Sequence, residues 1–300
     1  MPAGPGGVRG AGGKGRRARP VARAGWPARL ATVLKYLSLV AASVVVLLPL
    51  GVVLLTSLKT SDELARGGGP LSMPDDWLNF ANYVTAFEKG QMAEAAFNTF
   101  VILIVSITGT VFIGSAAAYA IDRFSFRFKK LVVAMFLFAT LVPSITTQVT
   151  TFQVVNQLGL FNTRLAPIML YLGTDIVAIY IFLQFIRSIP VSVDEAARMD
   201  GASALTVYWK IILPLLKPAI ATVVIVKGIA VYNDFYIPFL YMPDQNLGTV
   251  STSLFRFKGP FGAHWENISA GTILVIVPTL AIFLMLQRFI YNGLTQGAAK

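Results

Sequence analysis

The sequence contains no cysteine, has a single histidine, and carries charge on only 13% of its 300 residues. Without cysteine the chain can form neither a disulfide nor a thiolate metal site. The sequence therefore gives no information on the redox state of the protein's compartment. A soluble domain of this size has about twice this charged fraction. Hydrophobic residues instead make up 55% of the chain, many of them in long runs. These proportions exclude an ordinary soluble domain.

Signals of catalysis are equally scarce. The one histidine, His264, is expected outside the membrane without a nearby acid and nucleophile, and no pair of carboxylates suggests acid–base chemistry. Gly13-Lys14 does not form a phosphate-binding loop, because Val8 stands at the first glycine position and Gly15 replaces the serine or threonine. We therefore expect no catalytic residues, no metal site and no cofactor in this chain.

Six apolar segments dominate the rest of the sequence. Each is about 20 residues or longer, enough for a helix to cross a bilayer core of about 30 Å. Backbone groups in lipid must be hydrogen-bonded within their own segment, so we expect helices rather than open sheet. The sequence predicts an all-α membrane protein with six transmembrane helices, near residues 36–58, 97–121, 131–150, 165–187, 211–240 and 268–287.

Basic residues predict the orientation of these helices. Residues 1–35 hold eight basic residues and no acid, and we interpret residues 1–30 as a disordered basic cytoplasmic tail rather than a targeting peptide. With both termini inside, 17 of the 25 basic residues fall on the cytoplasmic side and six outside. We therefore predict that both termini are cytoplasmic. The net charge of +11 is then explained by the membrane topology and by contact with anionic lipid, rather than by binding of nucleic acid.

A polar segment separates the fourth and fifth predicted spans. Ser192 and Glu195 form a capping-box pattern, which predicts a helix start, and Gly201 permits a turn or a close backbone approach. Pro214 is expected in the first turn of the next span. The pattern predicts two short helices joined by a bend over residues 192–210. An amphipathic connector lying at the membrane surface would produce the same pattern.

The spacing within this segment is more specific than its composition. The order E-A-A, three residues, G, nine residues, I-x-L-P is met by Glu195, Ala196, Ala197, Gly201, Ile211, Leu213 and Pro214. It resembles the EAA motif of the membrane subunits of ATP-binding-cassette (ABC) importers, and the resemblance extends over roughly residues 80–300. Asn82-Tyr83 and Phe97-Asn98-Thr99 look like the start of that family's core domain. The loop at 158–163 and the ending at 293–300 are similar to the carbohydrate branch, specifically the second permease of maltose-type importers.

The resemblance implies a type I ABC importer permease in the bacterial plasma membrane, with a first helix and outer loop at 31–92 and a core domain at 93–300. It implies that residues 192–210 form a coupling helix that docks on a separate ATPase, with coupling residues Glu195, Ala196, Ala197, Gly201, Leu213 and Pro214. The implied partners are a second homologous permease, an ABC ATPase dimer, an extracytoplasmic solute-binding protein and a sugar or oligosaccharide substrate.

Two ionisable residues lie deep within predicted spans. Lys227 is expected about 20 Å beyond Pro214, and Asp175 about 15 Å from the outer start of its own span. At such depths an ionised side chain raises the free energy of membrane insertion by about 2.5–3.5 kcal/mol. A structural ion pair, the lining of a translocation cavity, and snorkelling of Lys227 toward the interface are three readings of this pattern. Tyr232, Asn233 and Asp234 follow, and such groups suit sugar recognition, although tyrosine and asparagine are also common near the interface. We regard these five residues as the candidate translocation pathway.

Other readings remain open from the sequence. The solute of such an importer could instead be a peptide, a polyamine or a phosphorylated small molecule. Six spans alone would also fit an autonomous channel, a secondary transporter or a membrane scaffold. The long loop at 241–267 contains Phe255, Phe257, Phe261 and Trp265, and it could contact the solute-binding protein or lie at the membrane interface.

Overall fold

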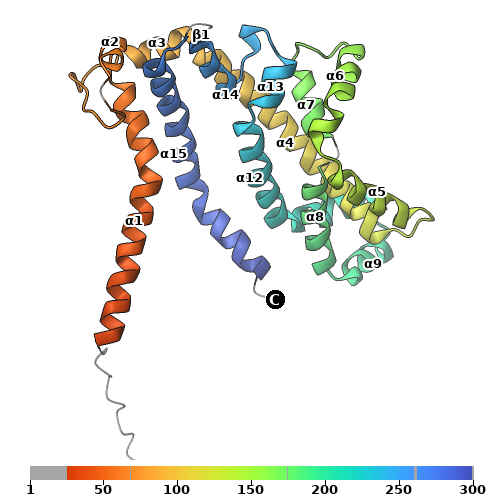
Figure 1. The fold of residues 1–300 in the computed structure, drawn as a ribbon. Coiled ribbons are helices and arrows are strands. Elements are labelled where there is room, and N and C mark those ends of the chain that lie inside the picture. The colour runs from red at the N-terminus through yellow and green to blue at the C-terminus, as the bar shows by residue number, and fades with distance from the viewer. Residues whose placement is uncertain (1–25, 68, 174, 260–261, 299–300) are drawn as a thin grey trace, which may run out of the picture. The chain divides into compact units, whose positions relative to one another are not determined.

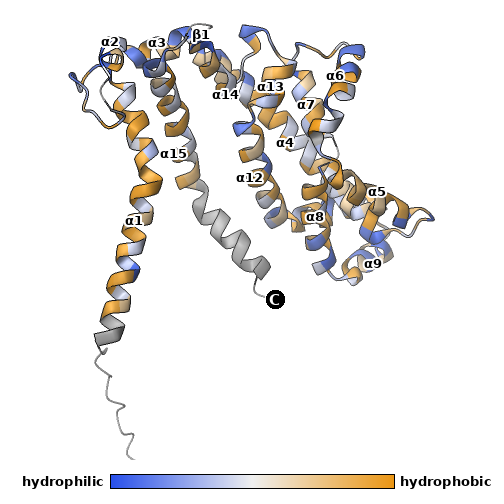
Figure 2. Ribbon diagram, in the orientation of Figure 1, coloured by the Kyte–Doolittle hydropathy of each residue, from blue (hydrophilic) through white to orange (hydrophobic). Residues whose placement is uncertain are grey.

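The computed structural model describes residues 26–67, 69–173, 175–259 and 262–298. They divide into a first unit that ends at Leu50 and a second that runs from Gly51 to Lys300. The first unit holds most of helix α1 (Trp26–Ser57), whose residues are hydrophobic nearly all round (Figure 2), as expected of a helix surrounded by lipid. Most of the basic tail predicted for residues 1–30 lies outside the described residues.

Three helices are long and apolar enough to cross a membrane. They are α1, α4 (Met92–Arg123) and α15 (Trp265–Ala298), with apolar spans at Leu30–Ser57, Met92–Arg123 and Trp265–Met285. Three pairs of shorter helices reach the same length and hydropathy together but are bent at a short break. The described residues therefore provide three straight spans, or up to six if each bent pair counts as one, and these positions match the six predicted segments.

The breaks follow from local sequence. The segment predicted at 131–150 is α5 (Lys129–Leu141), η1 (Ser144–Thr147) and α6 (Gln148–Gln157), bent by 91° where Pro143 cannot donate a backbone hydrogen bond. The next pair, α7 (Leu165–Leu172) and α8 (Ile176–Ser188), is bent by 42°. The third is α10 (Ala204–Val207), the π-helical turn η2 (Tyr208–Ile212) and α11 (Leu213–Leu215), followed after a 72° bend by α12 (Lys217–Asn233).

The remaining elements are short. They are α2 (Ser61–Ala65), α3 (Ala81–Lys89), α9 (Val191–Met199), α13 (Tyr236–Tyr241), η3 (Gln245–Leu247), α14 (Val250–Ser253), η4 (Leu254–Phe257), β1 (Lys258–Gly259) and β2 (Gly262–Ala263). The two strands pair antiparallel, with Lys258 opposite Ala263. Thr60 and Glu63 form a capping box at the start of α2, and the backbone N–H of Thr60 holds the pKa of the Glu63 carboxyl below its usual value.

Helix α4 lies at the centre of the second unit, against α8, α7 and α12 (Figure 1). Two glycines bring it close to its neighbours. A Cβ on Gly109 would lie 2.1 Å from Cδ2 of Leu172, and one on Gly114 would lie 3.3 Å from the ring of Phe182, which is fully buried. A side chain at Gly109 would require Leu172 to move, and one at Gly114 would require the Phe182 ring to shift by a few tenths of an ångström, so the two glycines allow α4 to pack closely against α7 and α8.

A polar cluster fastens the end of α1 to α3. The hydroxyl groups of Ser57 and Tyr83 lie 2.7 Å apart, and Nδ2 of Asn82 donates to the backbone oxygens of Ser57 and Lys59 at 2.8 Å each. These bonds satisfy carbonyl groups that the end of α1 leaves open. Asn82 and Tyr83, which sequence reasoning associated with entry to the core domain, therefore anchor α3 to the end of α1.

Candidate functional site

The polar segment between α8 and α12 forms an elbow, which we define as residues 191–207, comprising α9, the turn at Gly201 and α10. Gly201 has φ +86°, a left-handed conformation in which a side chain is strained. Its N–H donates to the oxygen of Arg198 at 3.0 Å, and the N–H of Ala202 donates to the oxygen of Ala197 at 3.0 Å. The predicted helix–bend–helix is therefore present, and Gly201 is the residue that permits the bend.

The predicted capping box at Ser192 is wrong. Helix α9 begins at Val191, directly after Pro190, and no side chain caps it. Pro190 fixes a backbone conformation that leads straight into the helix, so Ser192 is already helical and cannot act as the cap. The acidic residue in the first turn is Asp194, whose side chain points into the protein and is only 3% exposed.

Helix α9 has one face toward the protein and one toward solvent. Glu195 and Ala196 are exposed, whereas Ala197 is buried. Two large apolar side chains also lie in the open, because Met199 is 88% and Leu205 72% exposed. Sequence reasoning did not single them out, although Met199 follows Glu195 by four residues and so shares its helix face. The elbow therefore exposes two large apolar side chains, one of which shares a helix face with a carboxylate.

The end of the predicted motif lies at the 72° bend. Leu213 is half-buried and Pro214 exposed in α11, and Leu216 at the bend is fully buried. Pro214 was expected in the first turn of a continuous span, but it precedes the bend, and the first turn of α12 contains Pro218. Pro218 has no N–H to donate back across the bend, which favours a break at this point.

The ionisable pair predicted inside the membrane is in contact. Nζ of Lys227 in α12 lies 2.8 Å from Oδ2 of Asp175, and the two side chains are 15% and 18% exposed. Oδ1 of Asp175 also accepts from the backbone N–H of Ala178 at 3.0 Å, so this residue caps α8 at the break after α7. Lys227 in addition lies 5.7 Å from the centre of the Tyr171 ring.

A third charged residue joins this group through Tyr171. The Tyr171 hydroxyl donates to Oδ2 of Asp234 at 2.8 Å, and Oδ1 of Asp234 accepts from the backbone N–H groups of Tyr236 and Ile237 at 2.8 and 3.3 Å. Asp175, Lys227, Tyr171 and Asp234 therefore form one polar chain, which we call the intramembrane polar chain. Sequence reasoning missed Tyr171, because nothing local distinguishes it from an interfacial tyrosine.

The other two candidate pathway residues do not join this chain. The Tyr232 hydroxyl donates to the backbone oxygen of Val275 in α15 at 3.3 Å, and the amide of Asn233 donates to the oxygen of Ile229 at 3.0 Å. Asn233 is exposed. The five predicted residues are thus neighbours along α12 and α8, but only three of them share a network.

His264 has an acidic neighbour, contrary to the sequence-based expectation. Its Nδ1 lies 3.2 Å from Oε1 of Glu266, and the same oxygen accepts from the Ser61 hydroxyl at 2.7 Å. Since the serine donates to the carboxylate and not to the imidazole, the histidine cannot act as its base. Among the described residues no group of three or more His, Asp or Glu could hold a metal ion.

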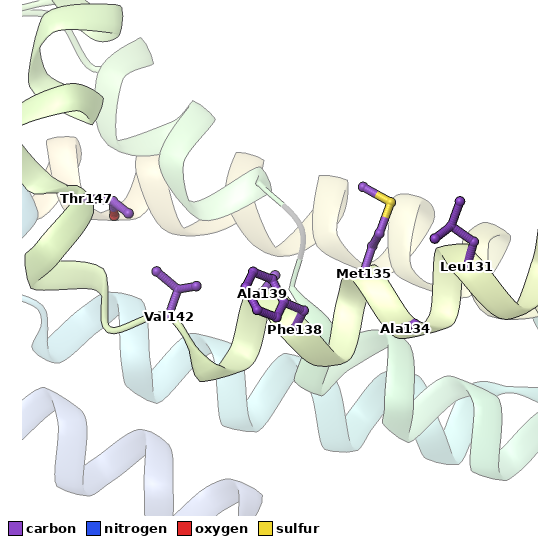
Figure 3. A pocket seen from close by; sticks show the side chains of 7 residues that line it. All are labelled: Leu131, Ala134, Met135, Phe138, Ala139, Val142 and Thr147. Atoms are coloured by element: carbon purple, nitrogen blue, oxygen red, sulfur yellow. The ribbon is translucent and has the colours of Figure 1, made fainter.

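Two surfaces complete the description. Of the aromatic residues in the loop at 241–267, Phe257 is buried and Trp265 is 62% exposed, while Phe261 lies outside the described residues. An open apolar groove of about 710 Å³ runs along one side of α5 and the break after it (Figure 3). Its lining residues are Leu131, Ala134, Met135, Phe138, Ala139, Val142 and Thr147.

Known proteins resemble most of this chain in sequence. Residues 110–296 match the family described as "Binding-protein-dependent transport system inner membrane component". The chain is 29% identical to the melibiose/raffinose/stachyose import permease protein MelC of Bacillus subtilis (strain 168), over 84% of this chain and 91% of that protein. It is 31% identical to the probable starch degradation products transport system permease protein AmyC of Thermoanaerobacterium thermosulfurigenes, with the same coverage of 84% and 91%.

The fold has a counterpart among solved structures. A chain in the crystal structure of a bacterial ABC transporter involved in the import of the acidic polysaccharide alginate superimposes with a TM-score of 0.76. The match covers 88% of this chain and 98% of that chain at 19% identity, so it reports on the fold alone. The family match takes in the elbow and all four residues of the intramembrane polar chain. The chain therefore belongs to the family of binding-protein-dependent transport system inner membrane components.

Proposed function

We propose that the chain is the membrane-spanning permease subunit of an ATP-driven importer for a sugar or oligosaccharide, and that its elbow docks on a separate ATPase. The observation that carries the proposal is the exposed face of the elbow, where Glu195, Met199 and Leu205 point outward. An exposed apolar patch beside a charged group is characteristic of a protein interface. Lipid would offer no partner to the carboxylate.

Membership of the family sets the general role. The chain is a transport component rather than a catalyst, and a multi-pass protein of the cytoplasmic membrane. We infer the finer assembly from the resemblance stated above: a second homologous permease, an ABC ATPase dimer and an extracytoplasmic solute-binding protein. Glu195, Ala196, Ala197 and Gly201 would then contact the ATPase. Leu213 and Pro214 would transmit the movement of the ATPase to the bend before α12.

The carbohydrate assignment draws on the relatives. The proteins named above carry the names of melibiose, raffinose, stachyose and starch degradation products, and others at 27% and 31% identity are named for arabinooligosaccharides and trehalose. The candidate pathway residues suit such a solute, because Tyr232 and Asn233 offer a ring face and an amide near Asp234. We propose that Lys227, Asp175, Tyr232, Asn233 and Asp234 lie along the pathway, with Lys227 and Asp175 neutralising one another.

The test is purification of the tagged chain from its own host under mild detergent. An importer subunit should retain an ABC ATPase, and the reconstituted complex with its binding protein should take up labelled neutral di- and trisaccharides only with ATP. Uptake of peptides or polyamines in place of sugars would support the other solute classes. Conduction by the chain alone in liposomes would contradict the proposal and indicate an autonomous channel.

A further inference from the structure

The last residue of α4, Arg123, reaches two other elements from a buried position. Its side chain is only 5% exposed. Nε donates to Oδ2 of Asp194 in α9 at 3.1 Å, and one terminal nitrogen donates to the backbone oxygen of Ile189, just past the end of α8, at 2.7 Å. The other terminal nitrogen pairs with Asp122 at 2.7 Å. One guanidinium group therefore ties together α4, α8 and α9.

Asp194 receives this contact on the inner face of the elbow. Its Oδ1 accepts from the Tyr119 hydroxyl at 3.1 Å while its Oδ2 accepts from Arg123, so both carboxylate oxygens are bound in a buried site. Successive helical residues are turned by about 100°, which is why Asp194 points inward and Glu195 outward. Rotation of α9 about its axis would separate the Asp194 carboxylate from Tyr119 and Arg123. A buried charge that loses its partners is strongly unfavourable.

The residue directly after the elbow is held by the same helix. The hydroxyl groups of Tyr208, at the start of η2, and Ser115, in α4, lie 2.8 Å apart. The Tyr208 ring also packs on the Tyr119 ring, with centroids 5.6 Å apart. Helix α4 thus holds the chain on both sides of Gly201: Arg123 and Tyr119 contact α9, and Ser115 contacts Tyr208, the residue directly after the elbow.

We propose that Arg123 and Asp194 are positioning residues for coupling: they lock α9 to α4 and α8, so that a displacement of the elbow moves these membrane helices as one body. This inference rests on the proposed docking of the elbow on an ATPase. Neither residue touches the partner, because both side chains are buried within this chain. Their role is to prevent the elbow from bending on its own when it is pushed.

A nearby ion pair offers a matched control. Arg187 lies 3.5 Å from Asp122 at the same end of the molecule, but its side chain is 63% exposed. An exposed pair contributes little, because water and salt screen it and its side chains remain mobile. The variants Arg123→Gln and Arg187→Gln therefore remove the same chemical group from a buried joint and from an exposed position.

The experiment uses the importer assembled with its own ATPase, partner permease and binding protein in lipid nanodiscs. Because the chain has no cysteine, spin labels on Thr108→Cys in α4 and Ser192→Cys in α9 report how firmly the elbow is held. A separate Asn233→Cys variant reports movement of the membrane helices, through its rate of reaction with a maleimide in the nucleotide-free state and after trapping with ATP and vanadate. ATP hydrolysis is measured on every complex.

Asp194→Asn and Arg123→Gln should broaden the spin-label distances and reduce the nucleotide-dependent change in maleimide rate by about tenfold, the size of effect expected from losing a charged hydrogen bond. ATP hydrolysis should continue, and Arg187→Gln should behave like the wild type. Arg123→Lys should restore part of the response, since an ammonium can pair with Asp194 but cannot reproduce the separate contacts of the guanidinium nitrogens with Asp122 and the backbone oxygen of Ile189.

Unchanged distances and maleimide rates in Asp194→Asn and Arg123→Gln would overturn the inference while leaving the proposed function intact. If both variants fail to assemble, the Arg123→Lys variant provides the test. A wild-type change in its maleimide rate would contradict the positioning role of Arg123 and Asp194, whereas an intermediate change supports that role. A wild-type chain that binds no ATPase would instead refute the proposed function itself.

Discussion

The side chains of Lys227 and Asp175 form an ion pair 2.8 Å long between α12 and the first residue before α8. Both groups lie on segments that the sequence places inside the bilayer, and each is about five-sixths buried. The aspartate also caps α8. The pair therefore neutralises a charge within the membrane, and its aspartate also satisfies one backbone donor at a helix break.

Replacing Lys227 by methionine tests whether the pair is structural or part of the pathway. The change leaves a carboxylate without its cation, and we expect the assembled complex to lose about 1–3 kcal/mol of stability, less than for a fully buried pair because the site is partly open. Thermal unfolding of the complex measures this loss. The double variant Lys227→Met with Asp175→Asn should recover much of it. Unchanged uptake in a stable Lys227→Met complex would remove Lys227 from the candidate pathway.

Gly201→Val tests the bend of the elbow. Valine at φ +86° is strained by about 1–2 kcal/mol, and the side chain would also project into the docking surface, where the structure leaves open space. We expect ATP hydrolysis to continue while uptake falls. Gly159→Val is the matched control, because Gly159 has φ +68°, equally open surroundings and a position outside the elbow. If both variants transport normally, the elbow does not couple the two activities.

The apolar face of the elbow should account for much of its affinity for the ATPase. Met199→Asp places a charge where an apolar side chain would be buried, and burial of methionine contributes about 1.5–3 kcal/mol. The dissociation constant should therefore rise by about tenfold to a hundredfold, as measured by retention of the ATPase during purification at graded concentrations. Leu78→Asp, at a 75% exposed position in the loop before α3, should have no effect.

Orientation can be tested with two matched methionines. Met73→Cys lies in the loop between α2 and α3, and Met199→Cys lies in the elbow; both positions are well exposed. With both termini cytoplasmic, a membrane-impermeant maleimide added to intact protoplasts should label Met73→Cys at once and Met199→Cys only after permeabilisation. Because the chain has no native cysteine, any label on the purified chain must be at the introduced position. The reverse pattern would invert the predicted topology and remove the elbow from the ATPase.

Features encoded by local sequence were the ones that could be predicted. The long apolar runs of α1, α4 and α15 indicated spanning helices, because hydropathy depends on composition alone. Gly201 was predicted correctly as a bend because few other residues adopt its conformation. The Lys227 and Asp175 contact could be suggested because two opposite charges in lipid need partners.

Features that depend on tertiary contact escaped prediction. Hydropathy cannot measure a bend, so the angles at the breaks near Pro143 and Leu216 could not be predicted, although proline in these spans is compatible with a bend. The capping box at Ser192 failed because Pro190 occupies the cap position, so the helix starts two residues earlier than the pattern suggests. The contact between Arg123 and Asp194 joins residues 71 positions apart, and no local pattern in the sequence connects them.

The intramembrane polar chain runs from the break before α8 to the break before α13, through Asp175, Lys227, Tyr171 and Asp234. Each terminal carboxylate binds the first turn of a helix with one oxygen and a neighbouring helix with the other. Straightening either break would therefore separate a carboxylate both from the helix that it caps and from the helix beside it, so that each discontinuity is stabilised from two directions.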